Sequence, residues 1–423
     1  MRKLTMCFVL LLIPFMVVAA GNQEGSSEEK KVELSVWSWV LSEGSGPVMR
    51  EIFNEYEEKN PHVSISIIES TWTQAHDKLL AMYVGGQLPD VIQVNRNWLM
   101  EFDSLGILED LTSYVDGVPG LREKFYEPLR GELNGQVLML PYIGGNAVLV
   151  YNKQHFDKLG IVPPTTLDEF VEVGKILTSG DGNSYATQLC ISASNTAGAV
   201  VCNYGPILYS FGGRVIEDGK SAFNSPEGVA ALKWMVDLEK KYGIAAPGSI
   251  TVDAKGMRES LASGHTFMNF DGAWGIQFYN NFEDLEIGIA PMPRGAELGT
   301  TVNLSMWGLP KGGEKNDEAW KLLEFMYSDE KMLQLFREAN LMPTMPKFAD
   351  LPEFSKHQGF FDTLANTTNY YQTGSIPQEM DFYNIIVRAY HEYFLGEKSA
   401  QKALDDAAVA YDKVIERFYS MKK

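Results

Sequence analysis

The sequence predicts an α/β protein of two lobes, each built on an open sheet. Strand and helix signals alternate β-α-β-α-β over the first hundred residues, an order that indicates an open α/β sheet. The length of 423 residues exceeds what one hydrophobic core usually organises, so two lobes are expected. A β-rich stretch at 137–151 is interrupted by Gly144-Gly145-Asn146, which can form a bulge in one strand or a crossing between two domains.

The elements of the N-terminal part follow from apolar spacing and from breaker residues. Strands are expected where β-formers cluster or alternate, at residues 32–40, 63–67 and 89–94. Pro47 suits a first helical position, and apolar residues at helical spacing follow it until Asn60-Pro61. A second helix is expected at 73–84, ended by Gly85-Gly86.

The C-terminal part alternates in the same way. Thr166 is a candidate cap for a helix at 167–177, with Glu169 three residues on. Further helices are expected at 226–242, 317–326 and about 400–418, and strands at 265–270 and 287–293. The segment 213–221 resembles a phosphate-binding loop but has five residues between its glycines instead of four, so a hairpin turn is predicted.

The N-terminus predicts export. Arg2 and Lys3 precede an apolar run at 6–17 and small residues at 18–20, so residues 1–20 are predicted to be a cleaved signal peptide, with a retained anchor as the alternative. Residues 21–31 are polar and are expected to form a disordered tether. A soluble periplasmic or extracellular protein follows. Cys190 and Cys202 could pair there, or remain as buried free thiols.

Charge and motifs exclude several function classes. A net charge of −19 argues against nucleic acid as a partner, because its phosphate backbone requires a basic surface. The sequence has no G-x-S-x-G, H-E-x-x-H, C-x-x-C or G-x-G-x-x-G motif, and its six histidines lack ligand spacing. No enzyme activity, metal or cofactor is therefore predicted. A secreted glycoside-processing enzyme using two of the many carboxylates stays as an alternative.

A series of short motifs runs in order through the chain. Trp37-Ser38-Trp39 ends the first strand, and Pro89-Asp90-Val91 forms a turn before the third. The most specific piece is Leu149-Val150-Tyr151-Asn152-Lys153 with Phe156, Lys158 and Gly160. The others lie at 53–63, 106–111, 140–142, 163–170, 268–274, 290–293 and 319–321. In this order they resemble the extracellular solute-binding proteins of bacterial ABC importers, in the sugar-binding family that includes maltose-binding protein. Tyr142-Ile143 is bulkier than the small residues that often follow the opening proline of that signature.

The resemblance implies a type 2 periplasmic binding fold, with ligand held in a cleft between two α/β lobes. Lobe one would comprise 32–142 and 293–340, and lobe two 143–292 and 341–423. The Gly144-Gly145 interruption would be the first of three crossings between them, and a hinge. The implied function is a monomeric receptor that captures a mono- or oligosaccharide and delivers it to the permease subunits of an ABC importer.

Candidate ligand residues lie at strand ends, because open α/β sheets bind ligands beyond the carboxyl ends of their strands. A sugar offers apolar faces and a rim of hydroxyls, so aromatic plates with placed polar groups suit it. The candidates of lobe one are Trp39, Ser42, Glu43, Trp72, Asn95 and Trp98, with Tyr142 and Asn146 at the first crossing. The other candidates are Tyr204, Asp271, Trp274, Asn303, Trp307 and Tyr371. For Trp39 and Trp72, packing within the lobe is an equal alternative.

A second hypothesis keeps the fold and changes the ligand to a phosphate ester, a polyamine or a peptide. An anionic ligand would require arginine or lysine side chains near the strand ends, where Arg96 and Arg388 could contribute.

Overall fold

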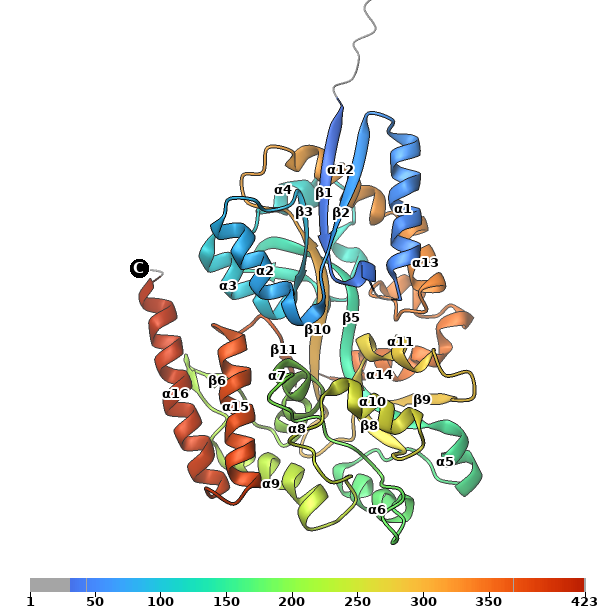
Figure 1. The fold of residues 1–423 in the computed structure, drawn as a ribbon, viewed down its shortest axis with the longest axis vertical. Helices are drawn as coiled ribbons and strands as arrows, with labels where there is room; N and C mark the ends of the chain where they lie inside the picture. Colours follow the sequence, from blue (N-terminus) through green and yellow to red (C-terminus); the bar gives the residue numbers. More distant parts are fainter. Residues whose placement is uncertain (1–30, 43, 368, 422–423) are drawn as a thin grey trace, which may run out of the picture.

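The computed structural model describes residues 31–42, 44–367 and 369–421, and it forms two lobes stacked along the long axis (Figure 1). The expected signal peptide, the tether up to residue 30 and the candidate Glu43 lie outside the described residues. The two-lobe α/β architecture expected from the sequence is confirmed.

The first lobe is built on parallel strands. Strand β1 pairs in parallel with β2 and with β3, which confirms the β-α-β-α-β order expected for the first hundred residues. Pro47 lies in the first turn of α1, as predicted. The strands of this lobe are β1 (Val32–Ser38), β2 (Val63–Glu69), β3 (Val91–Asn95) and β4 (Gly131–Leu133), and its helices are α1 (Gly46–Lys59), α2 (Trp72–Val84), α3 (Leu99–Leu105), α4 (Thr112–Asp116), α12 (Asn316–Met326) and α13 (Asp329–Glu338).

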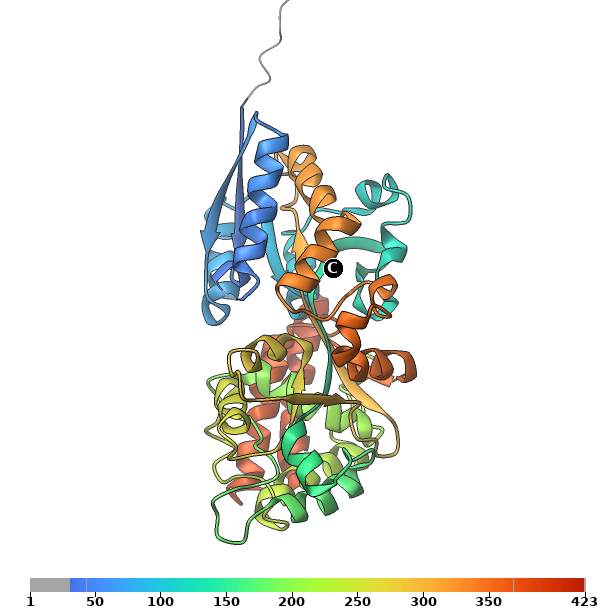
Figure 2. The ribbon, with the colours of Figure 1, turned by 90° about the vertical axis from the view of Figure 1, so that its right-hand side faces the viewer.

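A single strand joins the lobes where the sequence suggested two runs and a joint. Strand β5 (Gln136–Asn152) continues through Gly144 and Gly145, which pair with Leu304 and Asn303 of β10 (Gly299–Gly308). The φ angles of the two glycines are +139° and +156°, a region that disfavours side chains, so they turn the strand without ending its ladder. Beyond them β5 pairs with β8 (Met268–Gly272) and β9 (Ile287–Ala290) of the second lobe. Figure 2 shows β5 passing from one lobe into the other.

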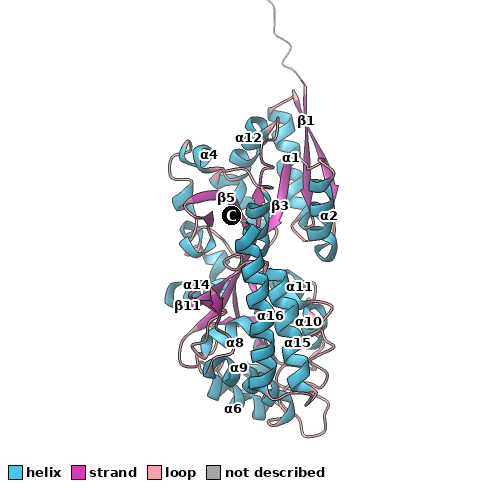
Figure 3. Cartoon of the chain, turned by 90° about the vertical axis from the view of Figure 1, so that its left-hand side faces the viewer, coloured by secondary structure: helices cyan, strands magenta, loops and turns pink. Residues whose placement is uncertain are grey.

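The second lobe is mostly helical, and helices cover the side of it that Figure 3 shows. Helix α6 (Leu167–Leu177) has the predicted bounds, and the Thr166 hydroxyl accepts a hydrogen bond from the Glu169 amide at 3.1 Å. The predicted hairpin is formed by β6 (Ile216–Glu217) and β7 (Lys220–Ser221). Cys190 and Cys202 are free and buried. The other helices are α5 (Lys153–Leu159), α7 (Thr196–Gly198), α8 (Gly205–Ser210), α9 (Pro226–Lys240), α10 (Ala254–Ala262), α11 (Ile276–Tyr279), α14 (Gln358–Asn366), α15 (Glu379–Phe394) and α16 (Ala400–Met421).

Two further segments connect the lobes. Strand β10 pairs with β3 of the first lobe as well as with β5, and β11 (Asn369–Gln372) pairs with the start of β10. The segment that follows α13 keeps contact with the first lobe. The Thr344 carbonyl accepts a hydrogen bond from the Tyr126 amide at 3.4 Å, and the Phe348 ring meets Phe336 of α13 edge-on with centroids 6.0 Å apart. We therefore propose that the limit of lobe one lies beyond residue 348 rather than at residue 340.

The buried carboxylate of Glu379 lies next to β11, the third of the segments that connect the lobes. Glu379, at the start of α15, accepts hydrogen bonds from the Tyr371 hydroxyl at 2.5 Å, from the Tyr383 hydroxyl and from the Gly374 amide. Burial raises the pKa of Glu379 from 4.5 to about 7, although these bonds and the nearby Arg96 oppose the shift. The carboxyl therefore titrates at a much higher pH in the folded protein than in the unfolded chain.

Because its folded pKa is raised, Glu379 contributes stability that is present below pH 4.5 and is lost as the pH rises through 7. Glutamine does not titrate. As the pH rises from 4.5 to 7, the free energy of unfolding of Glu379→Gln should therefore increase by about 3 kcal/mol relative to that of wild type. Urea denaturation across this range measures the difference, with the exposed Glu397→Gln as control. A difference between variant and wild type that does not change with pH would show that the carboxyl is not perturbed.

Candidate functional site

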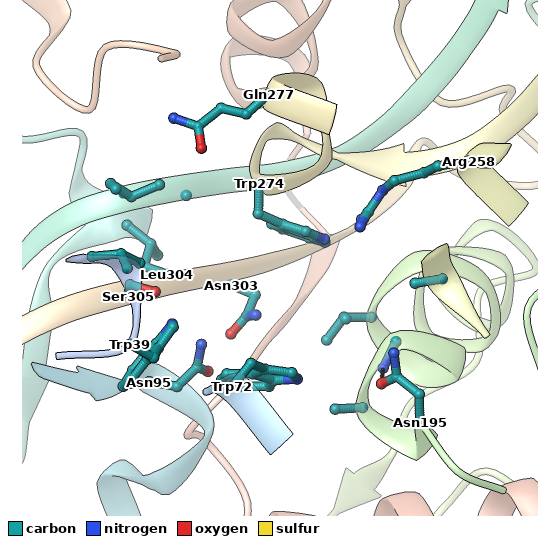
Figure 4. Close-up of a pocket in the computed structure, with 17 residues that line it drawn as sticks. Trp39, Trp72, Asn95, Asn195, Arg258, Trp274, Gln277, Asn303, Leu304 and Ser305 are labelled. Atoms are coloured by element: carbon teal, nitrogen blue, oxygen red, sulfur yellow. Dashed lines mark hydrogen bonds between the residues drawn. The ribbon is translucent and has the colours of Figure 1, made fainter. Parts of the chain in front are cut away.

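A cavity lies between the two lobes and is lined from both (Figure 4). It encloses about 900 Å³, counting the part open to solvent. Strands β5 and β10 form its floor through Ile143, Gly144 and residues 303–305. The side chains that line it from the first lobe are Trp39, Val40, Trp72 and Asn95, and those from the second lobe are Asn195, Ala197, Val201, Ala254, Arg258, Trp274 and Gln277, with Gly198.

Three tryptophans gather at the cleft edge of the first lobe. Trp39 follows β1, Trp72 follows β2 and opens α2, and Trp98 follows β3. These parallel strands end at the same edge, which brings the rings together. Trp72 and Trp98 stack with centroids 5.8 Å apart and an 11° interplanar angle, and Trp39 meets both edge-on at 5.6 and 5.4 Å. Trp39 and Trp72 line the cavity and form the wall, although Trp39 is only 3% exposed, whereas the buried Trp98 does not line it.

Trp274 lies on the opposite side of the cavity. It is in a 3₁₀ turn that directly follows β8 and therefore lies at the carboxyl end of a strand, where ligand residues were expected. A Cβ atom at residue 272 would lie 2.1 Å from Cζ2 of the Trp274 indole. The glycine therefore lets the ring pack closely against the backbone at the strand end. Figure 4 shows Trp274 across the cavity from Trp72, with Asn303 between them.

Three asparagines present amide groups whose oxygens are already bonded within the fold. The Oδ1 atom of Asn95 accepts from the Asn97 amide at 3.2 Å, and that of Asn195 accepts from the Gly198 amide at 2.9 Å. The Oδ1 atom of Asn303 accepts from the Thr373 hydroxyl at 3.0 Å. Because the oxygens are bonded in this way, the three NH₂ groups are left as donors toward the cavity.

Gln277 has the opposite polarity. Its Nε2 donates to the Ala339 carbonyl at 3.0 Å, which leaves its Oε1 as an acceptor. The cavity therefore combines aromatic faces, several donors and an acceptor.

Arg258 is held at the cavity by an ion pair. Its Nε and Nη2 donate to Oδ2 and Oδ1 of Asp271, each at 2.8 Å. The Asp271 side chain is fully buried, and the Arg258 side chain is 15% exposed. Although burial opposes the charge on Arg258, the Asp271 carboxylate raises the pKa of the guanidinium above its ordinary value. Arg258 is therefore a fixed cation with an Nη1 group that is not used by the pair.

Of the candidates predicted from the sequence, Trp39, Trp72, Asn95, Trp274 and Asn303 line the cavity. The structure places six others in the packing around it, because they point into a lobe or the sheet rather than along the strand ends. These are Tyr142, Asn146, Tyr204, Asp271, Trp307 and Tyr371, all buried. Trp98 supports the wall from behind, and Ser42 ends a 3₁₀ turn whose Val40 lines the cavity.

The two arginines considered for an anionic ligand do not line the cavity. The Nε atom of Arg96 donates to the Thr373 carbonyl at 2.9 Å, which holds this side chain within the fold. Arg388 lies in a separate depression between α15 and α16, together with Glu392, Lys398 and Asp406. The suggestion that Arg96 and Arg388 could contribute to an anion site is therefore contradicted for this cavity.

Four polar residues that line the cavity were not predicted from the sequence, namely Asn195, Arg258, Gln277 and Ser305. Gln277 follows Trp274 by one helical turn, a spacing that could have indicated it. Arg258 lies within α10 and Asn195 caps α7, so neither follows a strand.

Two absences hold for the part of the chain that the structure describes. No helix there has the length and apolar character of a membrane span. No group of three or more His, Cys, Asp or Glu side chains there is arranged to hold a metal ion.

Comparison with known proteins agrees with this architecture. A family model for bacterial extracellular solute-binding proteins matches residues 41–333, more than half of the chain. The arabinooligosaccharide-binding protein of Bacillus subtilis is 25% identical over 78% of this chain and 78% of its own. The sn-glycerol-3-phosphate-binding periplasmic protein of Salmonella typhimurium is 22% identical over 91% of this chain and 93% of its own.

Solved structures share the fold. A solute-binding protein of Thermotoga lettingae, bound with α-D-tagatose, has a TM-score of 0.81 at 24% identity and covers 90% of this chain and 99% of its own. Maltose-bound MalE3 of T. maritima has a TM-score of 0.78 at 23% identity, covering 89% and 98%. The predicted fold class, that of two-lobe periplasmic binding proteins, is confirmed.

The family and these neighbours are binding proteins, and the family supplies the ligand-binding component that works with permease subunits of ABC importers. The match of the family model over residues 41–333, together with the predicted motif order, assigns the chain. The chain belongs to the bacterial extracellular solute-binding protein family.

Proposed function

We propose that this protein captures a carbohydrate in the inter-lobe cavity and delivers it to an ABC permease. The observation that carries the proposal is the pair of tryptophan walls, Trp39 with Trp72 in one lobe and Trp274 in the other, on opposite sides of one cavity. The apolar faces of a sugar ring pack well on indole rings, and the two walls are placed to contact one ligand from both sides.

The polar groups of the cavity complement hydroxyl groups. A sugar hydroxyl accepts and donates at once, so it can bond to the NH₂ groups of Asn95, Asn195 and Asn303 and to the Oε1 atom of Gln277. Two aromatic faces at about 1.5–3 kcal/mol each and several hydrogen bonds at about 1 kcal/mol each would be partly offset by the entropy of association. A net of about −8 kcal/mol corresponds to micromolar binding.

The same arrangement supports closure on the ligand. A ligand that contacts both walls binds the closed form better than the open form, and this difference in affinity shifts the population toward closure. The connections β5, β10 and β11 are the segments that would absorb the motion, with Gly144 and Gly145 as the proposed hinge. The permease would then recognise the closed form.

Titration calorimetry with a panel of mono- and oligosaccharides, including L-arabinose, arabino-oligosaccharides, D-tagatose and maltose, tests the proposal. We expect at least one member of the panel to bind with a dissociation constant of about 10 µM or tighter. The same ligand should quench tryptophan fluorescence, because the cavity walls are indoles. If none of these sugars produces heat or a change in fluorescence, the proposal of a carbohydrate ligand is contradicted.

A second candidate ligand is a glycerophosphate-type ester. Two observations favour it, the presence of Arg258 on the cavity wall and the similarity to a glycerol-3-phosphate-binding protein. Tighter binding of sn-glycerol 3-phosphate than of every sugar in the same titration would select it.

A further inference from the structure

Arg258 differs from the other side chains of the cavity wall in carrying a charge. Among the described residues that line the cavity it is the one charged side chain. An isolated guanidinium at this place would favour a carboxylate or a phosphate, which it binds through two parallel hydrogen bonds. In this protein, however, the Nε and Nη2 donors of Arg258 already bind the two carboxylate oxygens of Asp271.

The Asp271 carboxylate is built into the second lobe by several donors. The Gly272 amide donates to its Oδ1 at 2.8 Å, and the Tyr279 hydroxyl donates to its Oδ2 at 3.1 Å. The Cys202 thiol lies 3.8 Å from Oδ1. The ion pair also packs on bare backbone, since a Cβ atom at residue 275 would lie 2.4 Å from Asp271 and 2.7 Å from Arg258. The contacts that hold Asp271 in the second lobe thus fix both the orientation and the charge of Arg258.

The free edge of Arg258 faces the ligand space beside Trp274 (Figure 4). Nη1 is the nitrogen that the ion pair leaves unused, and its N–H donors can bind hydroxyl or ring oxygens of an uncharged ligand. The pair carries no net charge, so an anion in the cavity would lose its hydration without meeting an uncompensated positive charge. The net charge of the whole chain, −19, disfavours the approach of an anion as well.

We propose that Asp271 sets the charge preference of the cavity. By neutralising and positioning Arg258, it makes the site one for an uncharged, hydroxyl-rich ligand rather than for a sugar acid or a phosphate ester. Arg258 is the ligand-contacting residue and Asp271 is a positioning residue. The inference rests on the carbohydrate-binding function proposed above and specifies its ligand class.

The test compares neutral and acidic sugars that differ at one carbon. D-glucose with D-glucuronate and D-galactose with D-galacturonate serve as probes, and sn-glycerol 3-phosphate serves as a phosphate ester. Four proteins are titrated, namely wild type, Asp271→Asn, Arg258→Gln and the double variant Arg258→Gln/Asp271→Asn. The measured quantity is the ratio of the affinity for the neutral sugar to the affinity for its acid.

The net charge at the pair is zero in wild type and in the double variant, +1 in Asp271→Asn and −1 in Arg258→Gln, and the expected ratios follow these charges. Wild type should prefer the neutral sugar by about tenfold or more, and Asp271→Asn should lower the ratio by about tenfold because it exposes an uncompensated cation. Arg258→Gln should raise the ratio, because it leaves the negative charge of the Asp271 carboxylate without its cation. The double variant should stay within about threefold of the wild-type ratio while binding both sugars more weakly.

A purely structural role for the pair would weaken both sugars equally, so an unchanged ratio in folded Asp271→Asn would overturn the inference. Should Asp271→Asn not fold, the predicted rise in Arg258→Gln decides, and an unchanged ratio there overturns it as well. Wild-type preference for a sugar acid overturns the charge inference and leaves the carbohydrate proposal standing. Binding of sn-glycerol 3-phosphate with no binding of any sugar overturns both.

Discussion

Replacing Trp274 by alanine is expected to weaken ligand binding roughly 10- to 100-fold with little change in the stability of the fold. The indole lines the cavity and is only partly buried, so the fold needs it less than a ligand stacked on it would. Calorimetric titration with the sugar that binds best measures the loss of affinity, and thermal unfolding measures stability.

Phe282→Ala is the matched control for this variant. Phe282 is an aromatic residue of the same lobe, 39% exposed, and it follows α11 outside the cavity. Its removal should leave the affinity unchanged. Equal affinities of the Trp274→Ala variant and wild type would show that the second lobe does not hold its ligand through this ring.

Replacing Gly144 by alanine is expected to lower the free energy of unfolding by about 3 kcal/mol or more. The residue has a φ angle of +139°, and a Cβ atom there would lie 2.4 Å from the carbonyl oxygen of Asn303 and 2.7 Å from the Cα of Leu304. Both obstacles belong to the backbone of β10, so side-chain movement cannot relieve them. The strand pair that connects the lobes would have to separate.

Urea denaturation measures this change. Gly180→Ala is the control, because a Cβ atom there meets no atom within 4 Å and its backbone conformation is open to other residues. A Gly144→Ala variant as stable as Gly180→Ala would mean that β5 and β10 do not approach as closely as described.

The same two glycines show where prediction from the sequence reached its limit. Local residue types indicated an interruption at Gly144-Gly145 and left open a bulge in one strand or a crossing between domains, whereas in the structure one strand runs through it from lobe to lobe. The reason is that its ladder partners, Asn303 and Leu304, lie more than 150 residues further along the chain. Helix α6, by contrast, was predicted to the residue because Thr166 caps it locally.

The residues that line the cavity also fall into those that the sequence could predict and those that it could not. Trp39, Trp72, Asn95 and Trp274 could be predicted because each ends a strand, follows one within two residues or opens the next helix, and strand ends meet at one edge of a sheet. Asn303 was predicted from its position before Leu309-Pro310.

Arg258 and Asn195 could not be predicted, because their positions depend on how helices of the second lobe pack beside the cavity. For Asp271 the strand-end rule gave the right neighbourhood but no role, since it contacts Arg258 instead of lining the cavity.

The most direct test of the central claim is a crystal structure with the sugar that binds best in the titration. We expect density for a sugar ring in the inter-lobe cavity, stacked on Trp274 and facing Trp39 and Trp72, with hydroxyl groups near the amide nitrogens of Asn95 and Asn303. A ligand bound elsewhere on the molecule, or bound between the lobes without contact to any of these indole rings, would contradict the proposal.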